Sequence, residues 1–272
     1  MDGTEKDKSY GLSATENDRL FSEIAPKYDF ANHLLSLNID KKWRRELVRL
    51  SEVHSGERVL DVCTGTSEVA IQFAKANPVG EIVGIDLSEE MLGIAREKIE
   101  NKELENKIEL LKGNALELPF EDSFFDIVSV AFGLRNMGDY DKGISEMVRV
   151  LKNAGRLVML EFSPPTESLF GRIYRFYLSK LIPFFGGVLS GSKEAYQYLS
   201  DSVCDFPKPE KIIEVMKKEN LKNTYSKKLT AGIVYLYRGQ KEAVDFRTKV
   251  PAEEKRAVND GRIIQGDLFN HI

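Results

Sequence analysis

One stretch of the chain constrains its fold more than any other: residues 58–86, which read RVLDVCTGTSEVAIQFAKANPVGEIVGID. An apolar run over 58–63 stops at a Thr-Gly-Thr turn, an amphipathic segment follows, and a second apolar run over 81–86 ends on a carboxylate. Short apolar runs on either side of an amphipathic segment predict a strand, a turn, a helix and a second strand. We therefore expect an α/β unit in which the turn follows the carboxyl end of the first strand.

The turn and the end of the next strand indicate a nucleotide-like ligand. The backbone at Gly65 can approach such a ligand closely, and Asp86 lies 21 residues further on. A carboxylate there can accept hydrogen bonds from both hydroxyls of a ribose. A dinucleotide fold requires more turn glycines around a pyrophosphate, and Asp61 would repel phosphates. Because Asp61 suits a cation, such as the ammonium of a methionine-like tail, an NAD-dependent oxidoreductase is the less favoured alternative.

The core of the chain alternates regularly between apolar runs and amphipathic segments. We predict strands at about 58–63, 81–86, 107–112, 126–132 and 156–162, followed by two runs, 222–229 and 232–238, that form a hairpin. Helical patterns lie at about 67–76, 89–101, 139–152 and 208–219, and a mainly helical stretch over 18–50 precedes the core. This alternation predicts a doubly wound α/β domain, with a parallel sheet and helices on both faces.

Composition and charge narrow the class of partner. The chain has 272 residues, 42% of them hydrophobic, which is enough for one large domain. Its net charge is −4 and it has no basic block, so we expect no nucleic-acid partner. Two cysteines, Cys63 and Cys204, and the lack of a signal peptide indicate a reducing, cytoplasmic location. Three scattered histidines are too few for a zinc site, so we expect no metal.

An aromatic-rich segment, residues 163–200, interrupts the alternation. Its apolar part carries Arg172, Arg175 and Lys180 between residues 168 and 189. A bilayer-spanning helix is nearly free of charge over about 20 residues, so this segment is not expected to span a membrane. It can instead cover an apolar pocket, lie reversibly on a membrane surface, or simply pack in the core. The sequence alone does not separate these three interpretations.

The ends of the third and fourth predicted strands carry further candidate ligand contacts. Asn114 and Ala115 follow the third strand, where an amide can bond the edge of an adenine and a small side chain leaves room for its face. Arg135 and Asn136 lie in the FGLRN turn after the fourth strand. In open α/β folds the ligand crevice lies beyond the carboxyl ends of the strands, so both should face it. A plain ion pair between Arg135 and a nearby acid is the alternative.

Residues 58–86 resemble motif I of the class I S-adenosylmethionine methyltransferases. More narrowly, residues 130–165 resemble the ubiquinone/menaquinone biosynthesis C-methyltransferases. Two signature regions of that family, 28–43 and 149–163, are recognisable, as are AYQYLSDSV and LTAGIVYLYRG at 195–203 and 229–239. The likeness covers roughly residues 20–240. It implies a class I methyltransferase (Rossmann-like) sheet of seven strands, mostly parallel, with a C-terminal antiparallel hairpin.

The chain also departs from the family pattern. Asn38 and Asp40 stand where glycine and histidine are common, and Thr64 and Ser67 flank the turn where the family is rich in glycine. Ala131 stands where many members have a serine that contacts the cofactor, which removes one hydrogen bond worth about 1 kcal/mol. None of these changes removes a group that the chemistry obviously requires.

The resemblance implies S-adenosyl-L-methionine as cofactor and a polyprenylated quinol as substrate. Demethylmenaquinol is the favoured substrate, and a 2-methoxy-6-polyprenyl-1,4-benzoquinol the second. We assign the stabilisation of a ring phenolate to Arg135, the orientation of the ring to Asn136, and a second polar contact to Tyr28. The predicted cofactor-binding residues are Asp61, Gly65, Thr66, Asp86, Leu87, Asn114, Ala115 and Ala131.

The same reasoning divides the chain into four parts. We expect a flexible N-terminus over 1–17, a helical cap over 18–50, a methyltransferase domain over 51–240 with the aromatic-rich insertion, and a charged tail over 241–272. Two other functions stay open: methylation of oxygen or nitrogen in another small molecule, and a cofactor-binding scaffold without activity. The sequence does not indicate an oligomeric state.

Overall fold

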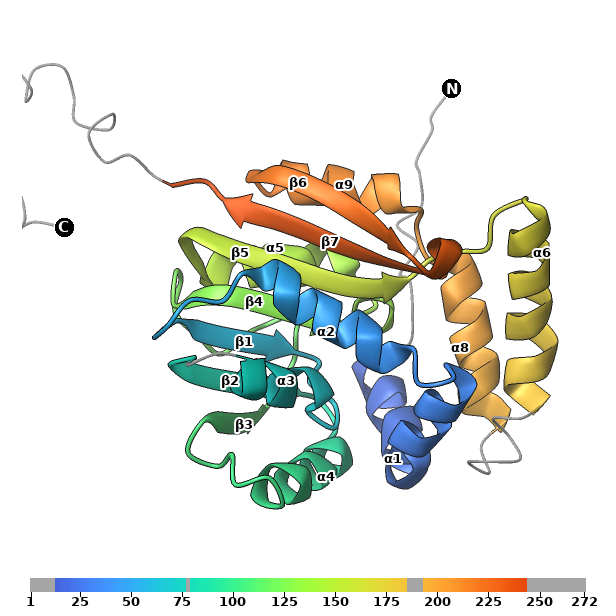
Figure 1. The fold of residues 1–272 in the computed structure, drawn as a ribbon, viewed down its shortest axis with the longest axis horizontal. Coiled ribbons are helices and arrows are strands. Elements are labelled where there is room, and N and C mark those ends of the chain that lie inside the picture. Colours follow the sequence, from blue (N-terminus) through green and yellow to red (C-terminus); the bar gives the residue numbers. More distant parts are fainter. Residues whose placement is uncertain (1–12, 77–78, 185–192, 244–272) are drawn as a thin grey trace, which may run out of the picture. The chain divides into compact units, whose positions relative to one another are not determined.

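The computed structural model describes residues 13–76, 79–184 and 193–243 (Figure 1). The architecture below belongs to the first of the two units into which the chain divides, residues 1–241. All but the first three residues of the predicted tail therefore lie outside the described residues.

A seven-stranded sheet forms the centre of the domain. Its strands are β1 (Arg58–Val62), β2 (Glu81–Asp86), β3 (Ile108–Lys112), β4 (Phe125–Ala131), β5 (Leu151–Phe162), β6 (Leu221–Leu229) and β7 (Val234–Lys241). They lie in the order β3-β2-β1-β4-β5-β7-β6, in which β1 to β5 are parallel and β7 runs antiparallel to both β5 and β6. The predicted sheet, with its antiparallel C-terminal hairpin, is confirmed.

Helices cover both faces of the sheet and bury separate apolar clusters. On one face lie α2 (Asp40–Ser51), α3 (Glu68–Ala76) and α4 (Glu89–Glu100), and on the other α5 (Tyr140–Val150) and α9 (Pro209–Lys218) (Figure 1). The strands alternate accordingly: Val59 packs toward α2 and α3, whereas Leu60 and Val62 pack toward α5 and α9. This burial on both faces explains the continuous apolar runs in the sequence.

Three further helices pack together beside the carboxyl ends of the strands. They are α1 (Ala14–Leu35), α6 (Leu169–Phe176), which continues into a π-helical turn (Tyr177–Leu181), and α8 (Lys193–Asp205). Leu20 and Ile24 of α1, Tyr174 of α6 and Tyr196 of α8 belong to one buried cluster. The insertion thus packs against the N-terminal helix, and its second half is a helix that the sequence did not predict.

Two predicted boundaries differ from the structure. The segment 1–17 was expected to be flexible, yet α1 begins at Ala14, because Ser13 and Glu16 form a reciprocal cap of the first turn. Residues 14–17 are therefore helical, and the division of the chain into four parts stays a prediction. Strand β5 begins at Leu151, earlier than predicted, because a bulge lets Leu151 pair with Phe125 directly after α5 ends.

Candidate active site

Two cavities meet at the carboxyl ends of the strands. The strand-end cavity, of about 130 Å³, lies over β1, β2, β3 and β4 and is closed by α1. The helix-lined cavity, of about 330 Å³, lies among α1, α6 and α8. Phe21 and Tyr28 of α1 and Phe132, which directly follows β4, line both cavities. Since strand order reverses beside β1, the strand-end cavity occupies the usual ligand position of an open α/β sheet.

Asp86 is held in place by backbone amides of the turn and of the next helix. Its Oδ2 accepts a hydrogen bond from the Gly65 N–H at 2.7 Å, and its Oδ1 accepts one from the Ser88 N–H at 3.0 Å. Burial raises the pKa of Asp86, and these amides partly offset that effect. Asp86 also lines the strand-end cavity, where its carboxylate can accept hydrogen bonds from ligand hydroxyls.

The turns around this cavity adopt backbone conformations that side chains rarely take. Gly65 has φ +55°, and the non-glycine residues Cys63, Ser67 and Phe132 have φ +53°, +61° and +61°. Left-handed residues of this kind cost roughly 1–3 kcal/mol each and gather at functional sites. A Cβ at Gly65 would meet nothing within 4 Å, so it is the backbone angle that favours glycine there.

Asp61 and Thr66 face a smaller side recess, of about 30 Å³, and not the strand-end cavity itself. The buried Asp61 carboxylate accepts hydrogen bonds from the hydroxyls of Thr64 at 2.7 Å and Ser129 at 2.8 Å. Burial raises its pKa to about 6, although these hydroxyls oppose the shift. Thr66 donates to Asp29 of α1 at 2.7 Å. The recess also contacts Gly65, Ala131 and Tyr28, so it adjoins the main cavities.

The remaining predicted cofactor residues line the strand-end cavity. These are Leu87, Asn114, Ala115 and Ala131, together with Gly65 and Asp86. The Oδ1 of Asn114 accepts the Leu116 N–H at 2.9 Å, which fixes the amide in the loop after β3. The side-chain NH2 group of Asn114 can therefore donate a hydrogen bond to a ligand. Which parts of a cofactor these residues contact stays a prediction.

Arg135 forms a buried ion pair and also lines the helix-lined cavity. Its Nη1 lies 2.6 Å from Oε1 of Glu161, which is fully buried at the end of β5, and also donates to the Phe132 carbonyl at 2.8 Å. Burial alone would lower the pKa of Arg135, but Glu161 raises it above its ordinary value. The guanidinium therefore remains a cation inside a largely apolar space. Arg135 thus pairs with an acid and also lines a cavity, and its role in the site stays a prediction.

Asn136 and Tyr28 complete the set of predicted catalytic residues. Asn136 follows Arg135 in a 3-10 turn yet lines the strand-end cavity, where its Oδ1 accepts the Tyr198 hydroxyl at 3.1 Å. Tyr28 comes from α1 and lines both cavities and the side recess. Burial raises the pKa of Tyr28, whereas the nearby Arg135 charge acts against this rise. The structure thus brings the three predicted residues together where the cavities meet.

Sequence reasoning missed several residues of the site. Glu161 lies within a recognised signature region, but nothing in its neighbourhood indicated that it would pair with Arg135. The strand-end cavity also contains Asn17 and Asp18, and Asn17 falls in the segment predicted to be flexible. Tyr174 and Tyr198 lie in the aromatic-rich insertion, where composition gave no means to choose among many rings.

Comparison with known proteins identifies the family. The model of the ubiE/COQ5 methyltransferase family matches residues 10–241. A demethylmenaquinone methyltransferase of Deinococcus radiodurans is 42% identical over 88% of this chain and 96% of its own length. The ubiquinone/menaquinone biosynthesis C-methyltransferase UbiE of Geobacter sulfurreducens is 44% identical over 82% of this chain and 87% of its own.

The chain belongs to the ubiE/COQ5 methyltransferase family. Among solved structures, a SAM-dependent methyltransferase from Thermotoga maritima has a TM-score of 0.58 at 20% identity, covering 83% of this chain and 100% of its own. That likeness supports the class I methyltransferase fold. The chain is therefore an enzyme of the methyltransferase class, as the resemblance implied, and S-adenosyl-L-methionine is its cofactor.

The strand-end cavity suits that cofactor. Asp86 lines it and can accept hydrogen bonds from ligand hydroxyls. The buried Asp61 carboxylate accepts hydrogen bonds from two hydroxyls, and the Arg44 cation, which is paired with Asp40, lines the same side recess. Among the described residues Asp61 forms no ion pair of its own, and a buried carboxylate of this kind is suited to a cationic ligand group. No cluster of carboxylates, thiols or imidazoles that suits a metal occurs in the described ranges 13–76, 79–184 and 193–243.

Proposed function

We propose that this enzyme methylates a ring carbon of a polyprenylated quinol, with demethylmenaquinol as the first candidate and a benzoquinol as the second. The observation that carries the proposal is the junction of two unlike cavities around Tyr28. One is lined by strand ends with carboxylates, and the other is apolar with the Arg135 cation in its wall. Such a pair of cavities suits a small charged cofactor beside an apolar ring that carries oxygen atoms.

The names of the relatives support the choice of substrate. The Deinococcus radiodurans protein is named for demethylmenaquinone, and the Geobacter sulfurreducens protein for both ubiquinone and menaquinone biosynthesis. Both cover most of this chain at more than 40% identity. We place naphthoquinol first because the name of the Deinococcus relative, which covers the larger share of this chain, specifies it.

In the proposed mechanism, the bound cofactor supplies a methyl group already activated by its sulfonium. Arg135 stabilises the oxyanion of an ionised ring hydroxyl, which makes the neighbouring ring carbon nucleophilic. Glu161 holds Arg135 through its Nη1 and its backbone N–H, at 2.6 and 3.2 Å. Asn136, bonded to Tyr198, keeps the wall between the cavities in one conformation. Apolar side chains around the ring exclude water.

The same mechanism requires an acceptor for the ring proton. Arginine is a poor base, and the pKa of Arg135 is raised further by Glu161. Burial likewise raises the pKa of Tyr28, which keeps its hydroxyl protonated. We therefore assign the proton to a bound water or to the substrate oxygen, and neither Arg135 nor Tyr28 acts as the base.

We also propose that the enzyme contacts the membrane surface reversibly through α6. No helix among the described segments has the length and apolarity to cross a bilayer. Helix α6 is nevertheless apolar on two faces. It buries Gly171 and Tyr174 against the domain, while Leu169, Ile173 and Phe176 are 69%, 59% and 58% exposed. A helix with a second apolar face requires a partner for that face.

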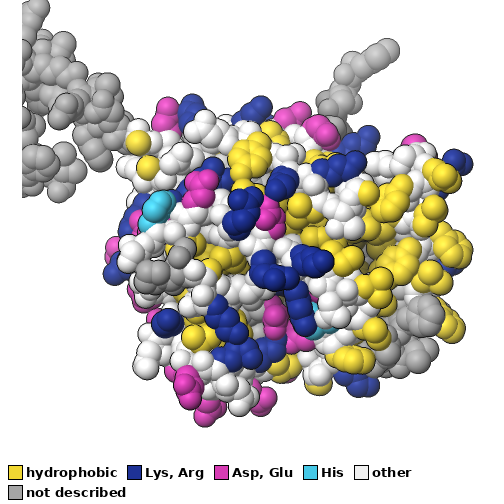
Figure 2. Space-filling model, in the orientation of Figure 1, with side chains coloured by type: hydrophobic (Ala, Val, Ile, Leu, Met, Phe, Trp, Pro, Cys, Tyr) yellow, Lys and Arg dark blue, Asp and Glu magenta, His cyan; other side chains and the backbone are white. Residues whose placement is uncertain are grey.

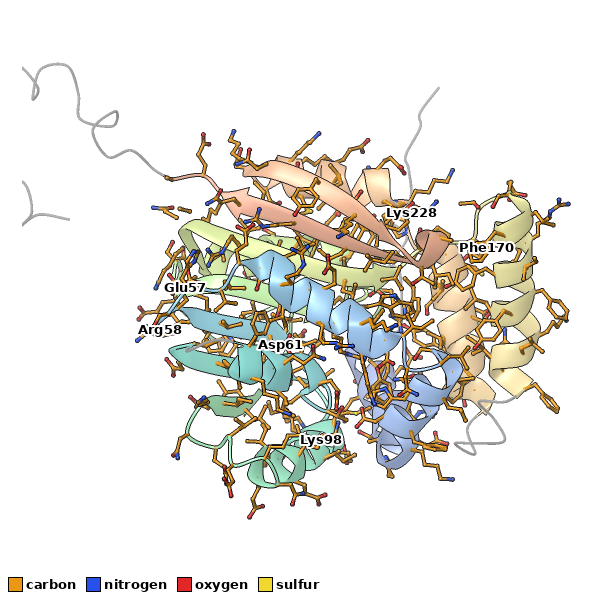
Figure 3. The ribbon with its side chains drawn as sticks, in the orientation of Figure 1. Glu57, Arg58, Asp61, Lys98, Phe170 and Lys228 are labelled. Atoms are coloured by element: carbon orange, nitrogen blue, oxygen red, sulfur yellow. The ribbon has the colours of Figure 1, made fainter. Side chains whose placement is uncertain are left out.

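The position of this second face favours a lipid surface as that partner. Figure 2 shows apolar side chains gathered on the part of the surface over α6, and Figure 3 places Phe170 on this helix. The π-helical turn after α6 supplies Tyr177 and Leu178 to the helix-lined cavity. The exposed residues Arg172 and Lys180 lie in the same segment and suit anionic lipid head groups. A prenyl tail can thus pass from the bilayer to the cavity without crossing water.

A panel of reduced quinones tests the proposed function. Purified enzyme is incubated anaerobically with labelled cofactor and with demethylated naphthoquinols and benzoquinols, with and without a prenyl tail. We expect label in the prenylated naphthoquinol at the highest rate. Transfer to oxygen or nitrogen of an unrelated small molecule, or cofactor binding without turnover of any quinol, would contradict the proposal.

A further inference from the structure

The hydroxyl group of Tyr174 has no part in the mechanism above. Tyr174 lies in α6 with 6% of its surface exposed, and its side chain lines the helix-lined cavity. Among the described residues, its hydroxyl oxygen has no hydrogen-bond partner. Buried polar groups are almost always paired, because an unpaired one carries a free-energy penalty. A phenylalanine would fill the same space without that penalty, so the hydroxyl is expected to serve a ligand.

Tyr174 lies in the electrostatic field of the catalytic arginine. Burial raises the pKa of Tyr174, and the Arg135 charge opposes this rise, as it does for Tyr28. The hydroxyl therefore stays protonated near neutral pH and can donate a hydrogen bond. Tyr28 of α1, Tyr174 of α6 and Arg135 of the turn after β4 thus line the same largely apolar cavity, and the Arg135 charge acts on both tyrosines.

We propose that Tyr174 binds the second ring oxygen of the substrate and thereby selects a ring with two hydroxyl groups. This inference rests on the proposed function, in which Arg135 stabilises the first, ionised oxygen. A reduced quinone carries two oxygens on opposite sides of its ring, and the second needs a partner when the ring leaves water. The Tyr174 hydroxyl donates to that oxygen, so each group satisfies the other.

A second tyrosine provides a matched control. Tyr237 of β7 is fully buried, and its hydroxyl likewise has no hydrogen-bond partner among the described residues. It packs in the apolar cluster beneath α5 and α9, however, and lines none of the three cavities described above. The two tyrosines share burial and lack of a partner, and they differ in access to the proposed substrate.

The test compares Tyr174→Phe and Tyr237→Phe with the wild type on two substrates. One is the prenylated demethylnaphthoquinol, and the other is the same molecule without the second ring hydroxyl. We expect Tyr174→Phe to lower the preference for the two-hydroxyl ring, measured as the ratio of kcat/KM values, by about fivefold to tenfold, because it removes one hydrogen bond. Affinity for S-adenosylhomocysteine and the melting temperature should not fall, and Tyr237→Phe should leave the preference unchanged.

Other outcomes overturn the inference in distinguishable ways. An unchanged preference in Tyr174→Phe, or a lower melting temperature with weaker S-adenosylhomocysteine binding, would show that the hydroxyl is structural. An equal loss of preference in Tyr237→Phe would show a general effect on the fold. If the wild type methylates neither ring, the proposed function itself fails, whatever Tyr174 does.

Discussion

The two cavities of this enzyme are built from opposite kinds of structure. The strand-end cavity takes many of its polar groups from the strand ends and the turns after them, where backbone amides fix Asp86, and hydroxyls fix Asp61 in the adjoining side recess. The helix-lined cavity is enclosed by helices from distant parts of the chain, and its walls are mostly apolar. Under the proposed function, cofactor binding depends mainly on local turns, whereas substrate binding depends on how α1, α6 and α8 pack.

The largest expected effect concerns the helix-lined cavity alone. Arg135→Ala should lower kcat by about 100-fold to 1,000-fold, the usual result of removing one donor to a developing oxyanion. The affinity for S-adenosylhomocysteine should stay within about threefold, because Arg135 does not line the strand-end cavity. Steady-state kinetics and calorimetry measure the two quantities. Equal losses of kcat and of S-adenosylhomocysteine affinity would show that the two cavities do not act independently.

This substitution needs a control for stability, since it leaves the Glu161 carboxylate buried without its partner. Removing one member of a buried ion pair costs roughly 3–5 kcal/mol, whereas replacing both members by apolar residues is often neutral. The double variant Arg135→Met with Glu161→Leu should therefore melt higher than Arg135→Ala and remain as inactive. Recovered turnover in the double variant would remove Arg135 from the mechanism.

The second prediction concerns the strand-end side. Asp61→Asn should weaken cofactor binding by roughly 10-fold to 100-fold, because a hydrogen bond to a charged group contributes about 1.5–3 kcal/mol. At neutral pH the free variant should be as stable as the wild type or more so. Burial raises the pKa of Asp61 from 3.8 to about 6, so the folded wild type loses stability as pH rises between these values. Tighter cofactor binding after Asp61→Asn would contradict a cationic partner for Asp61, which stays a prediction.

The Asp61 carboxyl also predicts how the affinity for the cofactor changes with pH. A cationic ligand group favours ionised Asp61, so below pH 6 binding must first release the proton. Affinity for S-adenosylmethionine should then fall by up to about tenfold per pH unit as pH drops below that value. Asp61→Asn should flatten this dependence in calorimetric titrations. A slope that persists in the variant would assign the proton to another group.

A third, smaller effect tests the membrane contact. Ile173→Glu should weaken binding to anionic phospholipid vesicles by about tenfold, since burial of one large apolar side chain contributes roughly 1.5–3 kcal/mol. Turnover of a tailless quinol should not change. Tyr225→Glu is the control, because Tyr225 is also apolar and 37% exposed but lies on β6, away from the cavity. Equal effects of both substitutions in a vesicle flotation assay would contradict docking through α6.

The smallest effect concerns the residue that both cavities share. Tyr28→Phe should raise the Kd for the cofactor and the KM for the quinol together, each by about threefold to tenfold, as expected for one lost neutral hydrogen bond. Every other substitution proposed above should affect only one of these two constants. A change confined to one of the two constants would show that Tyr28 serves a single cavity.

The sequence could indicate which residues lie together at the strand ends, because that information is local. Gly65, Asp86, Asn114 and Ala131 each lie at or just after the end of a strand, and once β1 to β4 are parallel those ends necessarily meet at one edge. The orientation of Asp61 was not predictable in the same way, because only the packing of Thr64 and Ser129 turns its carboxylate toward the side recess.

The helix-lined cavity was predicted only in part, because its contacts are long-range. The pairing of Arg135 with Glu161 and the approach of Tyr177 to the carbonyl of Leu35, at 2.5 Å, join segments that no local pattern connects. Helix α8 was not recognised either, since its aromatic residues follow no clear apolar period. The resemblance to a family identified the participants, and the fold was needed to show their arrangement.

The most direct test of the account is the position of the transferred methyl group. The enzyme is supplied with carbon-13 methyl-labelled S-adenosylmethionine and reduced prenylated demethylnaphthoquinone, and the product is examined by NMR. The account predicts a labelled methyl bonded to a ring carbon, formed by the wild type and nearly absent with Arg135→Ala. A labelled methoxy group, or the same yield from the variant, would contradict it.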